Sequence, residues 1–257
     1  LRGIIIQSGN DACIVVAEEI AGSEKGFSII MNDLAREIGL ENTNFTNSTG
    51  MFNESNYSTA YDLALLSQYL INNFPNYYHL FAETEFEWSG IKQKNRNPLL
   101  YKEMGADGLK TGHLSASGYG LAASAVQDGR RLISVTNGFS SSKKRSQGSS
   151  RLLTWGFREY TNINISNSDK AYAKIQLPLA SDDVDVFSLK DIKITVSKEN
   201  KDKITKKIII DQNLKAPIAA MTAVAKLEVT IDGNEKIYFD LINLENVEKA
   251  NFISRIF

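Results

Sequence analysis

The pattern of the chain changes near Tyr160, and this change limits the folds that the sequence can adopt. Before it, segments with helical spacing alternate with segments typical of strands. After it, the polar run NINISNSDK is predicted to be a linker, and short β-type segments follow: AKIQLPL, VDVFSL, KITVSK, KKIIID, AKLEVTI and KIYFDLI. We therefore predict an α+β domain over residues 1–160 and a small all-β, sandwich-like domain over residues 161–250.

Two amphipathic helices are predicted in the first domain. One begins at Ser23 and ends before Gly39, which stands where a C-terminal glycine is favoured. Its apolar positions, expected to face the core, are Phe27, Ile30, Met31, Leu34, Ala35 and Ile38. The other helix begins at residue 58 or 59, with Asp62 as the capping-box partner of Thr59, and ends before Pro75.

Strand patterns surround the Lys-Thr-Gly-His run of residues 110–113. The segments YGLAASAV and RRLISVTNG flank residues 127–129, and the Asp-Gly pair there predicts a β-hairpin. Because the Lys110 segment directly precedes this hairpin, we expect three adjacent antiparallel strands with Lys110 near one edge. After Ser140, a polar loop is expected to lead into a final helix with the sequence SSRLLTWGFREY.

Composition argues against several classes of function. A net charge of −1 gives no indication of nucleic-acid binding. Cys13 is the only cysteine, which excludes an internal disulfide, and its apolar surroundings predict a packed, unreactive thiol in a buried helix. With only His79 and His113 and no H-E-x-x-H or C-x-x-C motif, we expect no metal. No apolar run reaches the roughly 18 residues that a membrane-spanning helix needs.

Two short motifs carry chemical content. The run at residues 110–113 combines a positive charge, a hydroxyl and an open glycine backbone, against which an extended anionic peptide can bind. Alone, it also fits a strand end with a solvated lysine. The triplet Ser-Gly-Asn at residues 8–10 is ambiguous too, because Ser and Asn are favoured helix N-caps. Together, however, they match two parts of a three-part set described for β-lactamases and penicillin-binding proteins.

Longer runs of the sequence point to one family. They are IIIQSGNDACIVVAEEIAGSEKGF, STAYDLALLSQYL, WSGIKQKNRNPLL, DGLKTGHLSASGYGLAASAV, RLISVTNGFSSSKKR and SRLLTWGF, with LKAPIAAMTAVAKLEV and LINLENVEKANF in the β-rich part. Over essentially its whole length the chain resembles the low-molecular-mass penicillin-binding proteins that act as D-alanyl-D-alanine carboxypeptidases. The resemblance implies a β-lactamase/transpeptidase-like first domain, an antiparallel sheet with helices, that lacks its N-terminal part.

The resemblance implies a serine acyl-transfer reaction that removes the terminal D-alanine from peptidoglycan stem pentapeptides. It assigns Ser8 to proton transfer toward the leaving amine, Asn10 to hydrogen bonds with the substrate amide and the general-base lysine, and Lys110 to proton transfer and carboxylate binding. The remaining implied roles are carboxylate binding by Thr111 and Arg145, close backbone approach at Gly112, and oxyanion stabilisation by the His113 backbone N–H. It further implies β-lactam antibiotics as ligands, and no cofactor.

Two features depart from the family pattern. Leu114 stands where the family usually has a hydroxyl residue that helps to hold the carboxylate. The S-x-x-K motif, which supplies the nucleophilic serine and its lysine base, is expected well upstream of Ser8, and the chain contains no such match there. Literal matches at Ser140–Lys143 and Ser141–Lys144 follow the lysine motif in a predicted loop and are not expected to act. The start at Leu1, inside an apolar run, predicts that an N-terminal portion is absent and that the isolated chain is inactive.

Several functions remain open at this point. The alternatives to a carboxypeptidase are a non-catalytic module that binds peptidoglycan or a partner, and a DD-endopeptidase or β-lactamase. By resemblance, the full-length protein acts in the periplasm or another extracytoplasmic space, at the outer face of the cytoplasmic membrane, with peripheral membrane association. Residues 251–257 have apolar side chains at helical spacing and are expected to begin an amphipathic anchor.

Overall fold

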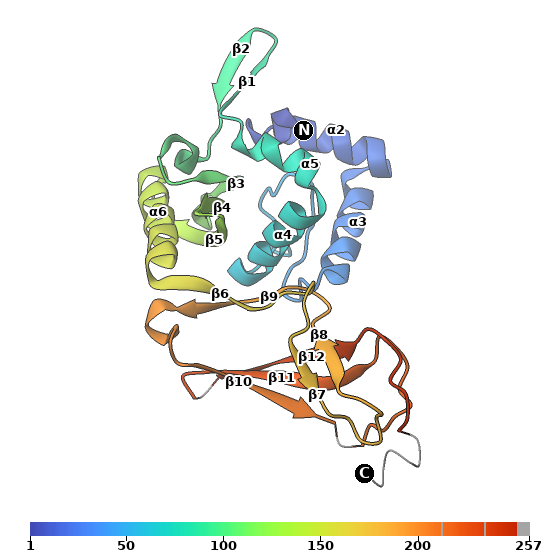
Figure 1. Cartoon of the computed structure of the whole chain (residues 1–257). Coiled ribbons are helices and arrows are strands. Elements are labelled where there is room, and N and C mark those ends of the chain that lie inside the picture. The colour runs from blue at the N-terminus through green and yellow to red at the C-terminus, as the bar shows by residue number, and fades with distance from the viewer. Residues whose placement is uncertain (212, 234, 251–257) are drawn as a thin grey trace. The chain divides into compact units, whose positions relative to one another are not determined.

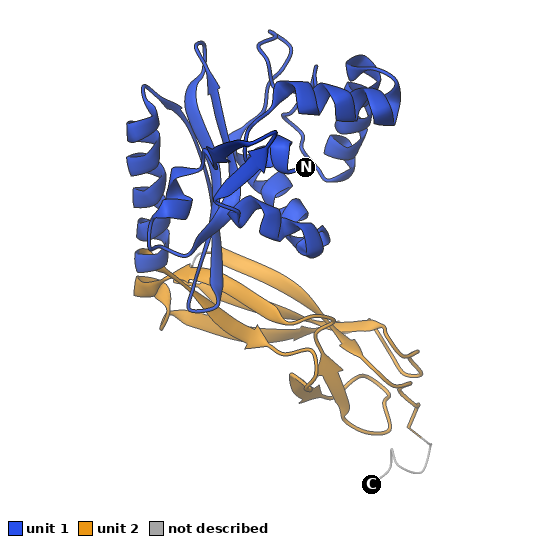
Figure 2. Ribbon diagram, turned by 90° about the horizontal axis from the view of Figure 1, so that it is seen from above, with its two compact units in different colours: residues 1–158 blue, residues 159–257 orange. Residues whose placement is uncertain are grey.

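The structure is a computed structural model that describes residues 1–211, 213–233 and 235–250. Its contacts divide the chain into two compact units, one of residues 1–158 and one that begins at Glu159 (Figure 2). Each unit has a hydrophobic core of its own. Residues 251–257, for which an amphipathic anchor is expected, lie outside the described residues.

A three-stranded antiparallel sheet forms the centre of the first unit. Its strands are β3 (Ala106–Leu114), β4 (Gly118–Gln127) and β5 (Arg130–Phe139), in the order β3-β4-β5. The turn between β4 and β5 has positive φ at Asp128 and Gly129, 50° and 74°, as a two-residue hairpin turn requires. The predicted hairpin and the position of the lysine motif on an edge strand of this sheet are confirmed.

Helices lie on both sides of this sheet (Figure 1). On one side, α6 (Ser142–Glu159) packs Leu153, 1% exposed, against Leu121 of β4. On the other side, α4 (Ala60–Asn73) contacts β5 and β4. The edge strand β3 therefore belongs to a sheet with helices packed on both sides, which is a suitable support for functional side chains.

The start of α6 differs from the prediction. The helix begins at Ser142 rather than Ser149, and the Ser141 hydroxyl accepts a hydrogen bond from the Lys144 N–H at 3.2 Å. Because the first two turns read SKKRSQG, they lack the apolar spacing by which a helix is recognised. The predicted polar loop is therefore wrong, and Arg145 belongs to the first helical turn.

The chain begins with the helices α1 (Arg2–Ile5), α2 (Asn10–Ala21) and α3 (Glu24–Glu37). The Ser23 hydroxyl accepts a hydrogen bond from the Gly26 N–H at 3.0 Å. Such a bond satisfies one of the free N–H groups in the first helical turn. The predicted start of this helix is confirmed.

The apolar faces of α2 and α3 are only partly covered. Ile30 and Leu34 of α3 are 46% and 38% exposed, and Val15 of α2 is 64% exposed. Cys13 is partly buried. The expectations of a core-facing α3 and a buried Cys13 helix are thus wrong for these side chains, because no element among the described residues packs over them.

At the beginning of α4 the predicted N-cap is present, but the Asp62 carboxylate does not form the predicted capping box. The Thr59 hydroxyl accepts a hydrogen bond from the Asp62 N–H at 3.1 Å, as a helix N-cap does. The Asp62 carboxylate, 1% exposed, accepts instead from the Asn42 N–H at 2.8 Å and from the Thr43 hydroxyl at 2.7 Å. The helix start is confirmed, whereas the carboxylate anchors the preceding loop and not a capping box.

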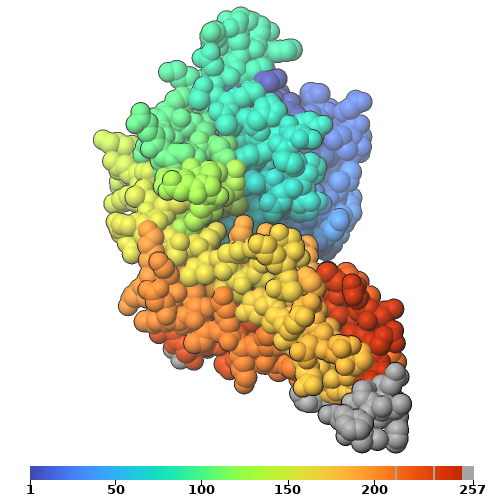
Figure 3. Space-filling view, in the orientation of Figure 1, coloured from blue at the N-terminus to red at the C-terminus, as the bar shows by residue number. Residues whose placement is uncertain are grey.

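A hairpin projects from the unit between α4 and β3 (Figures 1 and 3). It pairs β1 (Glu85–Trp88) with β2 (Ile91–Lys94). The sequence predicts β1 but not β2, whose four residues are all exposed and show no alternation. Short helices flank the hairpin: α5 (Pro75–Tyr78), η1 (His79–Ala82) and η2 (Pro98–Tyr101).

The second unit is an all-β sandwich. One sheet has the order β10-β11-β12-β8-β7, and the other pairs β6 with β9. The bounds are β6 (Tyr160–Ser166), β7 (Ala173–Ile175), β8 (Val184–Phe187), β9 (Ile192–Ser197), η3 (Lys198–Asn200), β10 (Ile204–Ile210), β11 (Ala223–Ile231) and β12 (Glu235–Asn243). Both sheets contribute to one core, in which Ile194 of β9 and Leu227 of β11 are 6% and 0% exposed. The predicted sandwich-like fold is confirmed.

Strand β6 occupies the segment that the sequence predicts as a linker. Ile165 is 6% exposed in the core of the second unit, and Ile163 packs against that core. The two isoleucines alternate with polar residues, which is the pattern of a half-buried strand. The abundance of Asn and Ser conceals this signal, so the linker prediction is wrong. Among the described residues, no helix has both the length and the apolar character needed to span a membrane.

Candidate functional site

The Ser-Gly-Asn triplet lies in the turn between α1 and α2. Gly9 is the N-cap of α2, and no side chain makes a capping hydrogen bond there. Ser8 has a φ of 57°, in the left-handed region that residues other than glycine seldom adopt. The interpretation of the triplet as a simple helix cap is therefore excluded, and its side chains are available for other contacts.

Lys110 brings the two motifs together. Its Nζ donates hydrogen bonds to the Ser8 hydroxyl and, at 3.1 Å, to the Thr111 carbonyl. The lysine lies in the middle of β3, opposite Ala122 of β4, and reaches across to the N-terminal end of α2. Residues 102 positions apart in the sequence thus form one polar centre.

The environment of Lys110 lowers the pKa of its amine to about 8. Burial is the largest cause, since it disfavours the charged form, and the nearby cations Arg96 and Arg145 act in the same direction. An amine with this pKa exchanges protons near neutral pH far more readily than an ordinary lysine. The pair of Lys110 and Ser8 is accordingly suited to proton transfer.

Asn10 lies beside this pair but makes a different contact from the implied one. Its Nδ2 donates a weak hydrogen bond to the Met51 Sδ at 3.6 Å, and the residue is exposed. A sulfur atom is a poor acceptor, so the amide loses little when it turns to a bound ligand. No hydrogen bond joins Asn10 to Lys110 among the described residues.

Arg145 anchors the far end of the lysine motif. The side chain is only 7% exposed, and its guanidinium donates to the carbonyls of Gly112 and Gly120 at 3.4 and 3.5 Å. It also lies 5.6 Å from the centroid of the Tyr119 ring. Burial lowers the pKa of this guanidinium, and its Nε has no partner among the described residues. A partly unsatisfied buried cation of this kind fits an anionic ligand.

The backbone beside Arg145 is open. A Cβ atom added at Gly112 would meet no atom within 4 Å. The exposed His113 stacks its ring on Tyr119, with the centroids 3.9 Å apart, so the imidazole is occupied by this contact. Thr111 is partly buried, and its hydroxyl makes no hydrogen bond among the described residues. These features leave the strand edge accessible to an extended chain.

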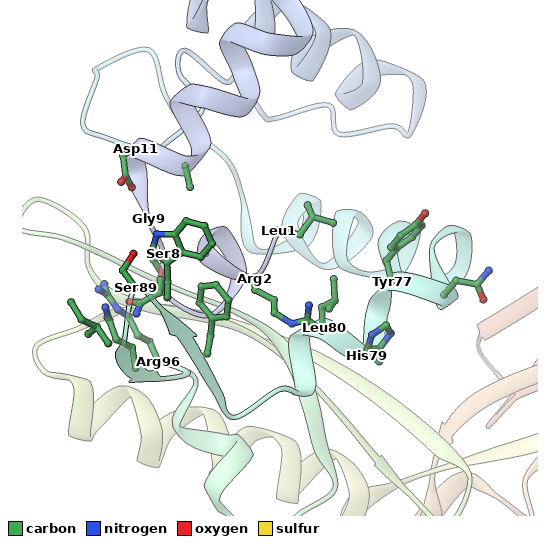
Figure 4. Close-up of a pocket in the computed structure, with 18 residues that line it drawn as sticks. Leu1, Arg2, Ser8, Gly9, Asp11, Tyr77, His79, Leu80, Ser89 and Arg96 are labelled. Carbon is green, nitrogen blue, oxygen red and sulfur yellow. The ribbon is translucent and has the colours of Figure 1, made fainter.

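A large hollow adjoins Ser8 on its other side (Figure 4). Its volume is about 1050 Å³, and its apolar lining includes Leu80, Phe86 and Trp88. Ser8 and Arg96 lie at the same end of this hollow. Volumes of this order hold ligands of several residues, so the hollow is a candidate extension of the site.

Arg96 is the site residue that the sequence motifs did not identify. It is exposed, whereas its neighbours Asn95 and Asn97 are 5% and 1% exposed. The Asn97 amide donates to the Gly108 carbonyl of β3 at 2.8 Å, and the Asn95 amide donates to the Glu83 carbonyl at 2.9 Å. Two buried amides therefore fix the backbone that presents Arg96. An arginine between two asparagines is the available sequence signal, and it is too common to single out a site.

Cys13 and the serines near α6 do not add a nucleophile to this centre. Burial raises the pKa of the Cys13 thiol, which disfavours the reactive thiolate. Ser141 lies at the start of α6, so the expectation that the Ser141–Lys144 match lies in a loop is wrong. The Ser141 hydroxyl accepts a hydrogen bond from the Lys144 N–H and thereby caps the helix. No cluster of three or more potential metal ligands occurs among the described residues.

Comparison with known proteins fits this geometry. Residues 1–141 match the family described as D-alanyl-D-alanine carboxypeptidase. The chain belongs to this family. Residues 160–249 match a second model, the C-terminal domain of penicillin-binding protein 5. The family resemblance inferred from the sequence is thereby confirmed for both units.

Curated relatives extend beyond this chain. It is 36% identical to the D-alanyl-D-alanine carboxypeptidase DacD of Escherichia coli, over 99% of this chain and 66% of the relative, and 37% identical to DacA of the same species, over 100% and 64%. The crystal structure of penicillin-binding protein 5 from Haemophilus influenzae is 34% identical, with a TM-score of 0.89, and the match covers 96% of this chain and 73% of that one. The chain thus spans about two thirds of the length of these carboxypeptidase relatives.

Proposed function

We propose that this chain forms the substrate-binding part of a serine-type D-Ala-D-Ala carboxypeptidase, which removes the terminal D-alanine from peptidoglycan stem pentapeptides. The contact between Lys110 and Ser8 is the observation that carries the proposal, because it places a readily titrating amine beside a hydroxyl. The open backbone at Gly112 and the buried Arg145 extend this centre into a carboxylate site. Membership of the D-alanyl-D-alanine carboxypeptidase family supports the same substrate.

In this proposal the peptide lies along the edge of β3. Lys110, Thr111 and Arg145 bind its terminal carboxylate through charge-assisted hydrogen bonds. The His113 backbone N–H faces the carbonyl oxygen on which negative charge develops, where one donor contributes about 100- to 1,000-fold in rate. Leu114, where the family usually has a hydroxyl residue, makes this pocket less polar at one side.

Proton transfer is proposed to run through the polar centre. The oxygen of the nucleophilic serine, which is not assigned among residues 1–257, loses its proton and forms a bond to the carbonyl carbon. The bond to the terminal D-alanine nitrogen breaks, and a proton passes to that nitrogen through Ser8 and Lys110. Asn10 orients the substrate amide. Water then hydrolyses the acyl-enzyme. Neither Ser8 nor a serine of α6 is assigned as the nucleophile, so residues 1–257 alone bind the peptide without forming an acyl-enzyme.

Recognition of β-lactams and an extracytoplasmic location belong to the same proposal. A similar structure, penicillin-binding protein D2 from Listeria monocytogenes, is 30% identical over 61% of this chain, has a TM-score of 0.57 and was determined in its ampicillin-bound form. Peptidoglycan stem peptides lie outside the cytoplasmic membrane, so we place the protein there, with peripheral membrane association.

The test compares acetylated peptides that end in D-Ala-D-Ala and in L-Ala-L-Ala. We expect residues 1–257 to bind the D,D peptide more tightly by calorimetry, and Arg145→Gln to weaken this binding. Mass spectrometry is expected to detect no penicilloyl adduct on this chain, while the full-length gene product is labelled by penicillin and releases D-alanine. Equal binding of both peptides, or a full-length protein that does neither, contradicts the proposal. Cleavage of an internal D-alanyl bond instead identifies an endopeptidase, and rapid hydrolysis of penicillin identifies a β-lactamase.

A further inference from the structure

The hollow beside Ser8 contains one arginine with a partner and one without. Arg2 lines it and forms an ion pair with Glu83, with Nε 2.6 Å from the carboxylate. Arg96 lines it as well, but the described residues provide no ion pair or hydrogen bond for its guanidinium. Asp11 is the one acidic residue of the described chain that lines the hollow, and it forms no ion pair with Arg96. A cation of this kind is available to a ligand.

Lys110, Arg145 and Arg96 together carry more positive charge than one carboxylate requires. Arg96 and Arg145 both lie close enough to lower the pKa of Lys110, and no carboxylate appears among the causes that act on this amine. A single terminal carboxylate is matched by Lys110 and Arg145 at the strand edge. Arg96 therefore remains without a counter-charge when a peptide with one carboxylate is bound.

The position of Arg96 shows which part of a peptide it meets. Ser8 and Arg96 share the hollow, whereas Lys110 and Arg145 do not line it. A peptide whose last residue lies at Arg145 and whose scissile bond lies at Ser8 continues into this hollow. Successive residues of an extended chain advance by about 3.3 Å. In the proposed binding mode, the residue before the terminal D-Ala-D-Ala pair therefore enters the hollow at the end where Ser8 and Arg96 lie.

We propose that Arg96 is a specificity residue that binds a second carboxylate, carried by the side chain of the residue that precedes D-Ala-D-Ala. The preferred substrates are dicarboxylic peptides, and peptides with an amine at that side chain are disfavoured by repulsion between like charges. The buried Asn95 and Asn97 fix the backbone that carries Arg96, which lowers the backbone entropy lost on binding. This inference rests on the proposed function and names the substrate class of the same site.

The experiment uses three peptides that differ at one side chain. They are N-acetylated X-D-Ala-D-Ala peptides in which X is L-α-aminoadipate, L-norleucine or L-lysine, so the side chain ends in a carboxylate, a methyl group or an amine. Binding to residues 1–257 is measured by calorimetry at low and high salt. We expect aminoadipate to bind about tenfold more tightly than norleucine, as one charge-assisted hydrogen bond provides. The lysine peptide is expected to bind more weakly than the norleucine peptide. High salt is expected to reduce the difference in affinity between each charged peptide and the norleucine peptide.

Variants of the chain assign the effect to one residue. Arg96→Gln is expected to remove the difference in affinity between the aminoadipate and norleucine peptides, and Arg96→Lys to retain part of this difference. Arg151→Gln, at an exposed position of α6, is the matched control and keeps the wild-type preference. Circular dichroism verifies that each variant is folded.

The possible outcomes separate the two proposals. Equal binding of all three peptides by the wild type, or a preference that survives Arg96→Gln, overturns the role of Arg96 and leaves the proposed function intact. Absence of binding of every peptide, including the norleucine peptide, contradicts the proposed function itself and with it this inference.

Discussion

Lys110 illustrates how a single residue trades stability for function. Its amine is largely buried beside other cations, and the pKa falls from 10.5 to about 8. At neutral pH the amine is still charged, so the fold bears the cost of a buried positive charge without a carboxylate partner among the described residues. Residues that carry such a cost are found more often at functional sites than elsewhere.

Replacement of Lys110 by methionine is expected to stabilise the chain at pH 7. Between about pH 8 and pH 10.5 the unfolded chain holds more protons at Lys110 than the folded chain, so wild-type stability rises with pH through this window. The gain of Lys110→Met is therefore about 1–3 kcal/mol below pH 8 and disappears above pH 10.5. Urea denaturation at pH 7 and pH 10.5 measures it. Lys143→Met, at an exposed position of α6, is the control. If the gain in stability of Lys110→Met does not depend on pH, the lowered pKa of Lys110 is contradicted.

Asn97, in contrast to Lys110, is expected to stabilise the fold. It supports the site and does not contact the ligand. Its amide nitrogen bonds to the Gly108 carbonyl at 2.8 Å and its amide oxygen to the Leu99 N–H at 3.0 Å, both in a buried setting. We expect Asn97→Ala to cost about 2–4 kcal/mol in the free energy of unfolding, because it leaves two buried backbone groups unsatisfied. Denaturant titration measures this loss. A change below about 0.5 kcal/mol contradicts it, and Asn76→Ala at an exposed position serves as control.

At the scale of elements, α6 determines where Arg145 lies. The helix packs closely on β5, and a Cβ atom added at Gly148 would lie 2.3 Å from the Phe139 ring. This contact leaves no room for a side chain, so glycine is required for the helix to approach the strand. The distance between helix and sheet, and thereby the reach of Arg145, depends on this pair.

The pair of Gly148 and Phe139 permits a test by double substitution. We expect Gly148→Ala to destabilise the chain by about 1–3 kcal/mol through overpacking and to weaken binding of the D,D peptide as α6 moves outward. Phe139→Leu removes the ring, so the double variant recovers part of both losses. Gln147→Ala, on the exposed face of the same helix, is the control. Additive effects in the double variant contradict a direct clash.

Elements with strong local signals were predictable from the sequence, and those that depend on distant contacts were not. The Ser23 and Thr59 caps and the Asp128-Gly129 turn act within a few residues, and all three are confirmed. The first turns of α6 and strand β6 lack clear apolar spacing, so only packing against the rest of each unit reveals them. In the site, the motifs indicate Ser8 and Lys110, while the role proposed for Arg96 rests on tertiary structure alone.

At the scale of the whole molecule, two separate cores imply two folding units. The second unit packs residues of both its sheets into one cluster, in which Val224, Leu227 and Leu241 are each 0% exposed. The helical layer of the first unit has apolar side chains on its surface, including Val15 and Ile20 at 64% and 59% exposure. We accordingly expect the second unit to be the more independent of the two.

This independence has a direct test. Leu227→Ala, in the core of the second unit, is expected to cost about 2–5 kcal/mol in the unfolding of that unit. The same loss is expected in a polypeptide of residues 159–250 and in the whole chain, measured by thermal circular dichroism. Binding of the D,D peptide by the whole chain stays unchanged. A parallel loss of peptide binding contradicts independent folding, and Lys206→Ala, at an exposed strand position, provides the control.

The unpaired arginine in the hollow affects more than equilibrium binding. Three neighbouring positive charges without carboxylate partners create an attractive field that acts on an anionic peptide before the two molecules touch. Association then becomes faster than diffusion alone allows for a neutral peptide, and it slows as ions screen the field. If the proposed peptide binding is correct, the rate of peptide capture therefore depends on the ionic strength of the surrounding medium.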